Sequence, residues 1–231
     1  MRAGITIQHA TERSTESELV RSDITAFLAV IPGARWPRGA VRGDYIEFTF
    51  ETWSELANNP ARPMFDPVSV RAVKSFFENG GRTAKLIGIC ITSQDDLLGQ
   101  DPSNLLWDPV MDRLRSDEDI GLLTMPLLAY LPVRFGRNAV EVAAEPIMSL
   151  LLEHCYQMNN RFAIFDAPRD LHEDALTRWV GEFRRRNAVF ASFGAIYYPW
   201  LMNGDEMFPP SGAVTGLFAR AENENNPLGV R

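Results

Sequence analysis

The sequence has few of the residue types that build disulfide-bonded or metal-held scaffolds. It contains two cysteines, Cys90 and Cys155, and three histidines, His9, His154 and His172, among 231 residues. Both cysteines lie in apolar runs, which is typical of small buried side chains and not of a disulfide framework. There is no HExxH, no CxxC and no pair of histidines at ligand spacing. We therefore expect neither a metal nor any other cofactor.

Positive charge and long apolar runs are also scarce. Lys74 and Lys85 are the only lysines, and the formal net charge is −7. A negative chain is a poor partner for nucleic acid, because phosphate binding needs a basic face. No apolar run approaches the roughly 18 residues that a membrane helix needs, and the N-terminus has no apolar signal core. We therefore expect no membrane insertion and a cytoplasmic location until a larger assembly leaves the cell.

What remains is the composition of an ordinary globular protein with an apolar core. Hydrophobic residues make up 45% of the chain and charged residues 23%. Apolar or alternating runs predict strands in the segments "ITAFLAVIPG", "YIEFTF", "TAKLIGICIT", "IGLLTMP", "RFAIFDAP" and "FASFGAIYYPW". Helical patterns lie between most of these strands, and a further helix is expected in the C-terminal tail. This alternation predicts an α/β fold with a helix-flanked, mostly parallel sheet.

Helix ends are marked by particular residues. Asp66 before Pro67 is typical of an N-terminal cap, and Asn79-Gly80-Gly81 is typical of a helix end. The spacing of Asp170 and Glu173 predicts a capping box on a helix that ends in Arg184–Arg186. The resulting division is an arm and linker over 1–20, an α/β unit over 21–95, a connecting segment over 96–118 and a second unit over 119–231.

One segment is compatible with catalysis or small-ligand binding. Asp166 ends the strand "RFAIFD", where ligands of open α/β sheets bind, and Asp170, His172 and Glu173 follow closely. The alternative is that Asp166 begins a turn and that the other acidic residues cap a helix, and we favour this alternative. No P-loop, GxSxG or GxGxxG is present, and adjacent His154 and Cys155 would point apart on a helix. We therefore expect a protein without enzymatic activity.

Two other segments have a more distinctive residue pattern than ordinary loops and strands. "AIYYPWL" groups Tyr197, Tyr198 and Trp200 around a proline at a strand end, and aromatic side chains with polar tips favour interfaces. The second segment is the rigid turn Pro209–Gly212, which precedes "AVTGLFAR". Taken alone, both are better explained as the edge of a core and the lead-in to a helix, and we favour that explanation.

Taken in order, these segments resemble the sheath proteins of contractile phage tails, R-type bacteriocins and extracellular injection systems. The family opens on a Gly-hydrophobic-x-hydrophobic arm, which Gly4, Ile5 and Ile7 match. An "AAFVG"-like strand after a Thr/Ser-rich entry is also typical of it, as are the patterns "TSWSEF", "FFxNGG", "RFAILDxP", "AALYYPW" and "PPSGHVAGVYAR". The matching segments here are "RSDITAFLAV", "FETWSEL", "FFENGGRTAKLIGI", "RFAIFDAP", "GAIYYPW" and "PPSGAVTGLFAR".

The resemblance implies a structural subunit with the tail-sheath core fold and an extended N-terminal arm. It also implies that subunits join through arms donated to a neighbour's sheet. In the family, the region after "GVYAR" leads to a further C-terminal domain, and we expect this chain, which ends at Arg231, to lack it. Loss of that domain favours an accessory or terminal ring over a minimal sheath.

The expected partners are other sheath or sheath-like subunits in a homo- or hetero-oligomer, with the inner tube, baseplate or cap as further contacts. The expected location is a phage tail or contractile injection particle. The assembly residues that the resemblance and the aromatic segment indicate are listed here: Gly4, Ile5, Ile7, Tyr197, Tyr198, Trp200 and Arg220.

Overall fold

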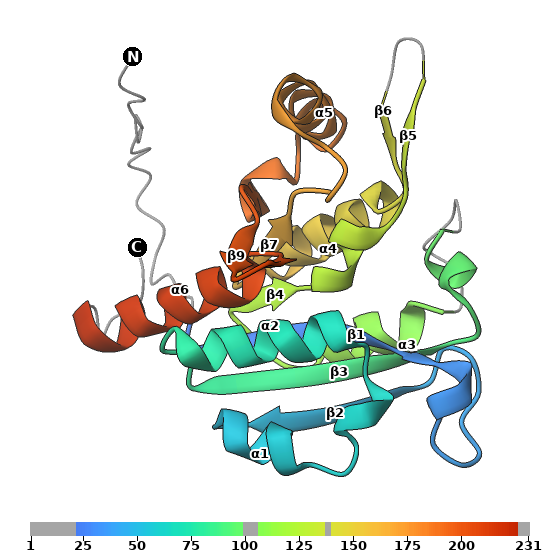
Figure 1. Ribbon diagram of the computed structural model, residues 1–231, viewed down its shortest axis with the longest axis vertical. Helices are drawn as coiled ribbons and strands as arrows, with labels where there is room; N and C mark the ends of the chain where they lie inside the picture. Colours follow the sequence, from blue (N-terminus) through green and yellow to red (C-terminus); the bar gives the residue numbers. More distant parts are fainter. Residues whose placement is uncertain (1–21, 99–105, 137–139, 226–231) are drawn as a thin grey trace.

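A six-stranded sheet organises the protein in a computed structural model, which describes residues 22–98, 106–136 and 140–225 (Figure 1). The strand order is β2-β3-β1-β4-β7-β8, and every neighbouring pair is parallel except β2 and β3. The expected α/β fold with a mostly parallel sheet is therefore confirmed. The strand bounds are Ile24–Pro32 (β1), Tyr45–Phe50 (β2), Thr83–Ile91 (β3), Leu122–Thr124 (β4), Phe162–Asp166 (β7) and Gly194–Tyr197 (β8).

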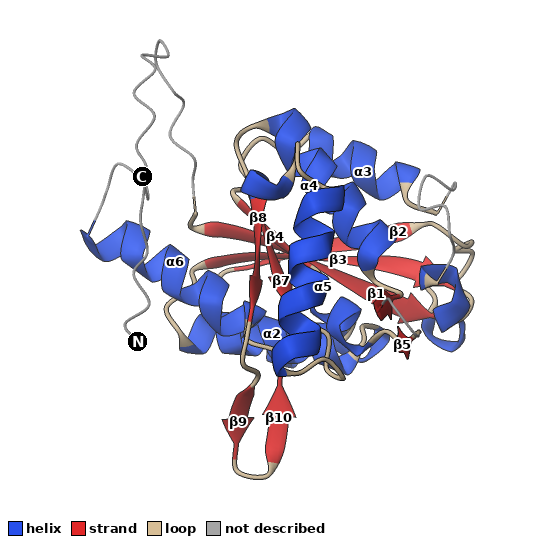
Figure 2. Ribbon diagram, turned by 90° about the horizontal axis from the view of Figure 1, so that it is seen from above, coloured by secondary structure: helices blue, strands red, loops and turns tan. Residues whose placement is uncertain are grey.

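Helices cover both faces of this sheet (Figure 2). Their bounds are Trp53–Asn58 (α1), Pro67–Glu78 (α2), Asp108–Arg115 (α3), Glu145–Met158 (α4), Glu173–Arg186 (α5) and Ser211–Asn225 (α6). Two hairpins complete the fold, and their strands are Val133–Phe135 (β5) with Val140–Val142 (β6), and Leu201–Asn203 (β9) with Glu206–Phe208 (β10). Neither hairpin, nor α1, was predicted from the sequence.

The central strand β1 divides the core into two clusters. Alternate side chains from Ala26 to Ile31 enter opposite clusters, as the period of a strand requires. One cluster contains residues of α3, α4 and α5, and the other contains residues of α1, α2 and α6. Cys155 lies in the first cluster and Cys90 in the second, so both cysteines are buried as expected.

The two ends of α2 are as predicted. The Asp66 carboxylate accepts a hydrogen bond from the Ser69 amide at 2.8 Å, which caps the helix. Its other oxygen accepts from the Val30 amide at 2.9 Å, so the cap also attaches α2 to β1. Beyond the last turn, Gly80 adopts a φ of 101°, a conformation that favours glycine.

The predicted capping box of α5 is wrong. The helix begins at Glu173, its N-cap residue is His172, and no side chain caps it. The reason is that Leu171 is buried in the core and its amide donates to the Pro168 carbonyl at 3.1 Å. This turn leaves Asp170 two residues before the N-cap position, and its carboxylate does not cap the helix.

An ion-pair network attaches α3 to β2 and β3. Asp117 accepts from Lys85 at 2.5 Å and from Arg113 at 2.8 Å, and Arg113 also contacts both carboxylate oxygens of Glu47 at 2.6 and 2.8 Å. Burial acts to raise the pKa of Asp117, but the hydrogen bonds from the two cations outweigh it and lower that pKa.

Helices α2 and α6 approach each other closely enough for glycine to be required. A Cβ added to Gly212 would lie 2.2 Å from the Ala72 carbonyl oxygen, and one added to Gly216 would lie 2.4 Å from the Phe76 carbonyl oxygen. Both contacts are with backbone, which cannot rotate away as a side chain can. The segment "SGAVTG" therefore packs one helix backbone directly on another.

We predict that Gly216→Ala lowers the free energy of unfolding by about 2–3 kcal/mol, because the new methyl group forces α6 away from α2. Gly181→Ala is the matched control, since Gly181 is an exposed helical glycine with nothing within 4 Å of its added Cβ. That control should raise the free energy of unfolding by about 0.5–1 kcal/mol. Urea denaturation of both variants measures the two effects, and equal behaviour would contradict the close packing.

Candidate assembly interface

The strand end that could have formed an active site is occupied by a structural contact. Asp166 is only 7% exposed, and its Oδ1 accepts a hydrogen bond from the Ser211 amide at 2.6 Å. Ser211 is the first residue of α6, so the carboxylate caps the positive end of that helix. Burial nevertheless raises the pKa of Asp166 to about 7. By contrast, Asp170, His172 and Glu173 are exposed.

The three segments around Asp166 join one another inside the protein. The Ala167 amide donates to the Tyr197 carbonyl at 2.9 Å, and the Trp200 indole donates to the Ala167 carbonyl at 2.8 Å. Trp200 also meets Tyr130 edge to face, with ring centroids 4.9 Å apart. With the Asp166–Ser211 contact, these bonds connect "RFAIFDAP", "GAIYYPW" and "PPSG". The segments that carried the resemblance therefore build the fold.

The seven assembly residues expected from the sequence lie in different environments. Trp200 is 8% exposed and Tyr197 is half-buried, whereas the Tyr198 side chain is 49% exposed. Arg220 is exposed on α6, where its side chain packs over Gly80. Gly4, Ile5 and Ile7 lie outside the described residues. Of the three aromatic residues in this set, Tyr198 is therefore the one whose side chain faces solvent.

The outer edge of β8 is open in the described part of the chain. β8 is the last strand of the sheet order and pairs with β7 alone. A small cavity of about 120 Å³ lies beside it, and apolar side chains dominate the lining. The lining residues are Leu152, Phe165, Val180, Phe183, Arg184, Ala191, Gly194, Ala195 and Ile196. An open edge next to an apolar cavity is a site where an added strand gains both hydrogen bonds and side-chain contacts.

An aromatic cluster continues this surface beyond the start of β8. The Tyr156 ring contacts Phe190 at 5.3 Å and Phe193 at 5.5 Å between centroids, and Val189 beside them is 64% exposed. Sequence reasoning did not identify these residues, because Tyr156 lies on α4 and the others lie just before β8. The open strand edge, its cavity and this cluster are named the β8 surface below.

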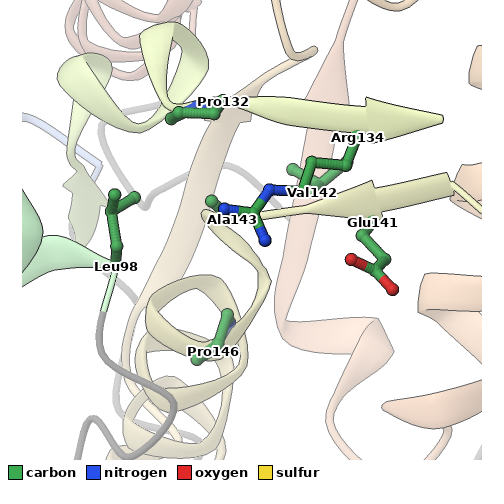
Figure 3. Close-up of a pocket in the computed structure, with 7 residues that line it drawn as sticks. All are labelled: Leu98, Pro132, Arg134, Glu141, Val142, Ala143 and Pro146. Carbon is green, nitrogen blue, oxygen red and sulfur yellow. The ribbon is translucent and has the colours of Figure 1, made fainter.

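Two further features of the described residues contain titratable side chains. The cavity at the base of the β5–β6 hairpin has a volume of about 200 Å³, and its charged residues are Arg134 and Glu141 (Figure 3). Figure 3 shows the Glu141 carboxylate pointing away from the Arg134 guanidinium. His154 is buried against Arg161 with its Nε2 3.1 Å from a guanidinium nitrogen, and burial followed by this cation lowers its pKa to about 4.

Within the described ranges, no group of three or more potential ligand residues is placed to hold a metal ion. Among those same residues, no helix combines the length and the hydrophobicity needed to cross a bilayer.

Comparison with known proteins gives structural matches only. No family model and no curated protein sequence matches the chain. The fold is similar to a chain in the six-fold symmetrised baseplate of the anti-feeding prophage, with a TM-score of 0.54 and 15% identity over 96% of this chain and 53% of that chain. It is also similar to a chain of the contracted helical sheath of the same particle, with a TM-score of 0.52, 16% identity and the same coverage.

These matches confirm the tail-sheath fold that the resemblance implied. The chain spans about half the length of the sheath and baseplate chains that it matches.

We predict that Asp166→Asn removes a pH dependence of stability. The folded-state pKa of about 7 lies above the ordinary aspartate value of 3.8, so the stability contributed by the protonated Asp166 is complete below pH 4 and is lost as the pH rises through 7. Between pH 5 and 8, the wild type should lose about 2–3 kcal/mol of unfolding free energy relative to the variant. Asparagine keeps an oxygen for the Ser211 amide and cannot ionise. Parallel pH profiles of the two proteins would contradict this.

Proposed function

We propose that the protein is a non-enzymatic structural subunit of a contractile tail or contractile injection particle. It joins sheath or sheath-like subunits around an inner tube or at the end of that tube. The observation that carries this proposal is the extent of the fold match, which covers 96% of the chain in both the baseplate and the sheath comparison. The segments that resemble sheath proteins also hold the interior of this fold together, through the Trp200–Ala167 and Ser211–Asp166 hydrogen bonds, and this supports the same proposal.

The β8 surface is the part of the described structure best suited to assembly. Subunits of a repeating lattice need contacts that form the same way many times, and an open strand edge provides main-chain partners with fixed spacing. Tyr198 and Val189 offer apolar area next to that edge. Within such a particle, the inner tube, baseplate or cap is a further partner, and neither nucleic acid nor a membrane is involved.

Two forms of this role differ in what the protein does alone. A minimal sheath subunit forms tubes by itself, whereas an accessory or terminal-ring subunit forms rings or joins only the ends of sheath made by another chain. We expect one of these assemblies in negative-stain images of the purified protein, alone or mixed with purified sheath and tube proteins of a contractile particle. A monodisperse monomer that stays off sheath in those mixtures would refute the proposed function.

We predict that Tyr198→Asp raises the protein concentration needed for assembly by about tenfold or more, because a charge replaces an exposed aromatic side chain beside the β8 edge. Val41→Asp is the matched control, since Val41 is an exposed apolar residue in the loop before β2. Light scattering against concentration measures both variants. Equal effects of the two substitutions would place assembly elsewhere on the molecule.

A further inference from the structure

A broad groove runs between α1, α2 and the β9–β10 hairpin, on a different part of the molecule from the β8 surface. Its volume is about 570 Å³. Four cationic side chains and two aromatic walls characterise it: Arg35, Arg62, Arg71, Lys74, Trp53 and Phe208. Trp53 belongs to the "FETWSEL" segment and packs, partly buried, against the core cluster that contains α1, α2 and α6.

Part of the groove's positive charge is neutralised within the chain. Arg71 forms an ion pair with Glu206 and stacks on the Phe208 ring at 4.1 Å. Lys74 lies 3.5 Å from Glu78, in a pair exposed to solvent, and 5.9 Å from the centre of the Trp53 ring. These contacts hold the hairpin against α2 and shape the groove walls.

The other two cations contact only backbone oxygens in the described residues. Arg35 donates to the Phe65 carbonyl at 3.4 Å, and Arg62 donates to the Ala57 carbonyl at 3.1 Å. Both side chains are exposed, and each guanidinium keeps further donors available for a carboxylate. Four cations against two carboxylates leave the groove with an excess of two positive charges, on a chain whose net charge is −7.

This charge contrast indicates what fits the groove. Copies of a chain with net charge −7 repel one another unless a basic face meets an acidic one. The start of α5 provides an acidic face, since the exposed Asp170, Glu173 and Asp174 outnumber the exposed Arg169 and Arg178 beside them. Asp170 and Asp174 form no ion pair within the described residues. The start of α5 lies beyond the hairpin end of the groove, because Arg169 stacks on Tyr130 at 5.6 Å and Tyr130 lines a small cavity with Arg71, Glu206 and Phe208.

We propose that the groove binds the acidic start of α5 from a second copy of this chain. This contact deepens the proposed function, because it specifies one way in which subunits meet. Since the groove and the start of α5 are different surfaces of one molecule, the contact joins unlike surfaces, head to tail, and repeats from copy to copy. Such a contact closes into a ring or continues as a helix, depending on the rotation between neighbours. Arginine suits the groove because its guanidinium binds a carboxylate through two hydrogen bonds.

Charge reversal tests this contact. Arg35→Glu with Arg62→Glu should weaken self-association by about tenfold or more, and Asp170→Arg with Asp174→Arg should do the same. Combining all four substitutions should restore association, because the charges of the two surfaces are then exchanged. Arg82→Glu with Arg115→Glu is the matched control, as both residues are exposed and lie outside the groove. Sedimentation velocity at about 0.05 M and about 0.5 M salt measures association, which the higher salt should weaken.

Several results would overturn the contact. They are wild-type association by the groove variant, failure of the fourfold variant to recover, an equal loss in the control, or no self-association of the wild type. Thermal unfolding by circular dichroism establishes that each variant is folded. The proposed function is judged separately, by electron microscopy of the wild type with sheath proteins. A protein that joins sheath but is insensitive to these reversals retains that function and loses only the head-to-tail contact.

Discussion

The direct contact between the backbones of α2 and α6 is the constraint on which the rest of the structure depends. Helix α2 covers β1 and β3, and Asp66 attaches its start to β1. Helix α6 lies on α2 through two glycines, and its own start is capped by Asp166 at the end of β7. The α2–α6 pair therefore connects strands from both halves of the chain. A side chain at either glycine would separate elements that are far apart in sequence.

This arrangement explains why the most distinctive segments of the sequence are inside the molecule. "FFENGG" ends α2, "PPSG" begins α6, and "YYPW" supplies the indole that binds the Ala167 carbonyl. Each segment is distinctive because a backbone shape or a buried hydrogen bond restricts the residue type. The contacts with other molecules that we propose use side chains under weaker local restriction, such as Tyr198 and Arg62. Similarity in these segments therefore indicates a fold, and the surface determines what that fold assembles with.

Much of the fold could be predicted from the sequence, because its strands are long apolar runs and α2 has clear end signals. The short pieces could not. Strands β9 and β10 have three residues each, and "NGD" between them is a turn signal too local to identify a hairpin. Asp170 and Glu173 have the spacing of a capping box, but burial of Leu171 decides where α5 begins. The groove was beyond sequence reasoning, since its walls come from residues near 35, 53, 62–78 and 203–208. Tyr198 follows the last residue of β8, as expected for an aromatic residue at a strand end, and its role in assembly stays a prediction.

The scarcity of lysine has a practical consequence for chemical labelling. Lys85 is 12% exposed and bound to Asp117, whereas Lys74 is 47% exposed on the wall of the groove. Amine-directed reagents react with accessible, unprotonated amines, and an ammonium held by a buried carboxylate reacts poorly. Apart from the terminal amine, such reagents therefore address one side chain, and that side chain lies beside Trp53. A dye attached to Lys74 would report on any molecule that enters the groove, and this labelling needs no engineered cysteine.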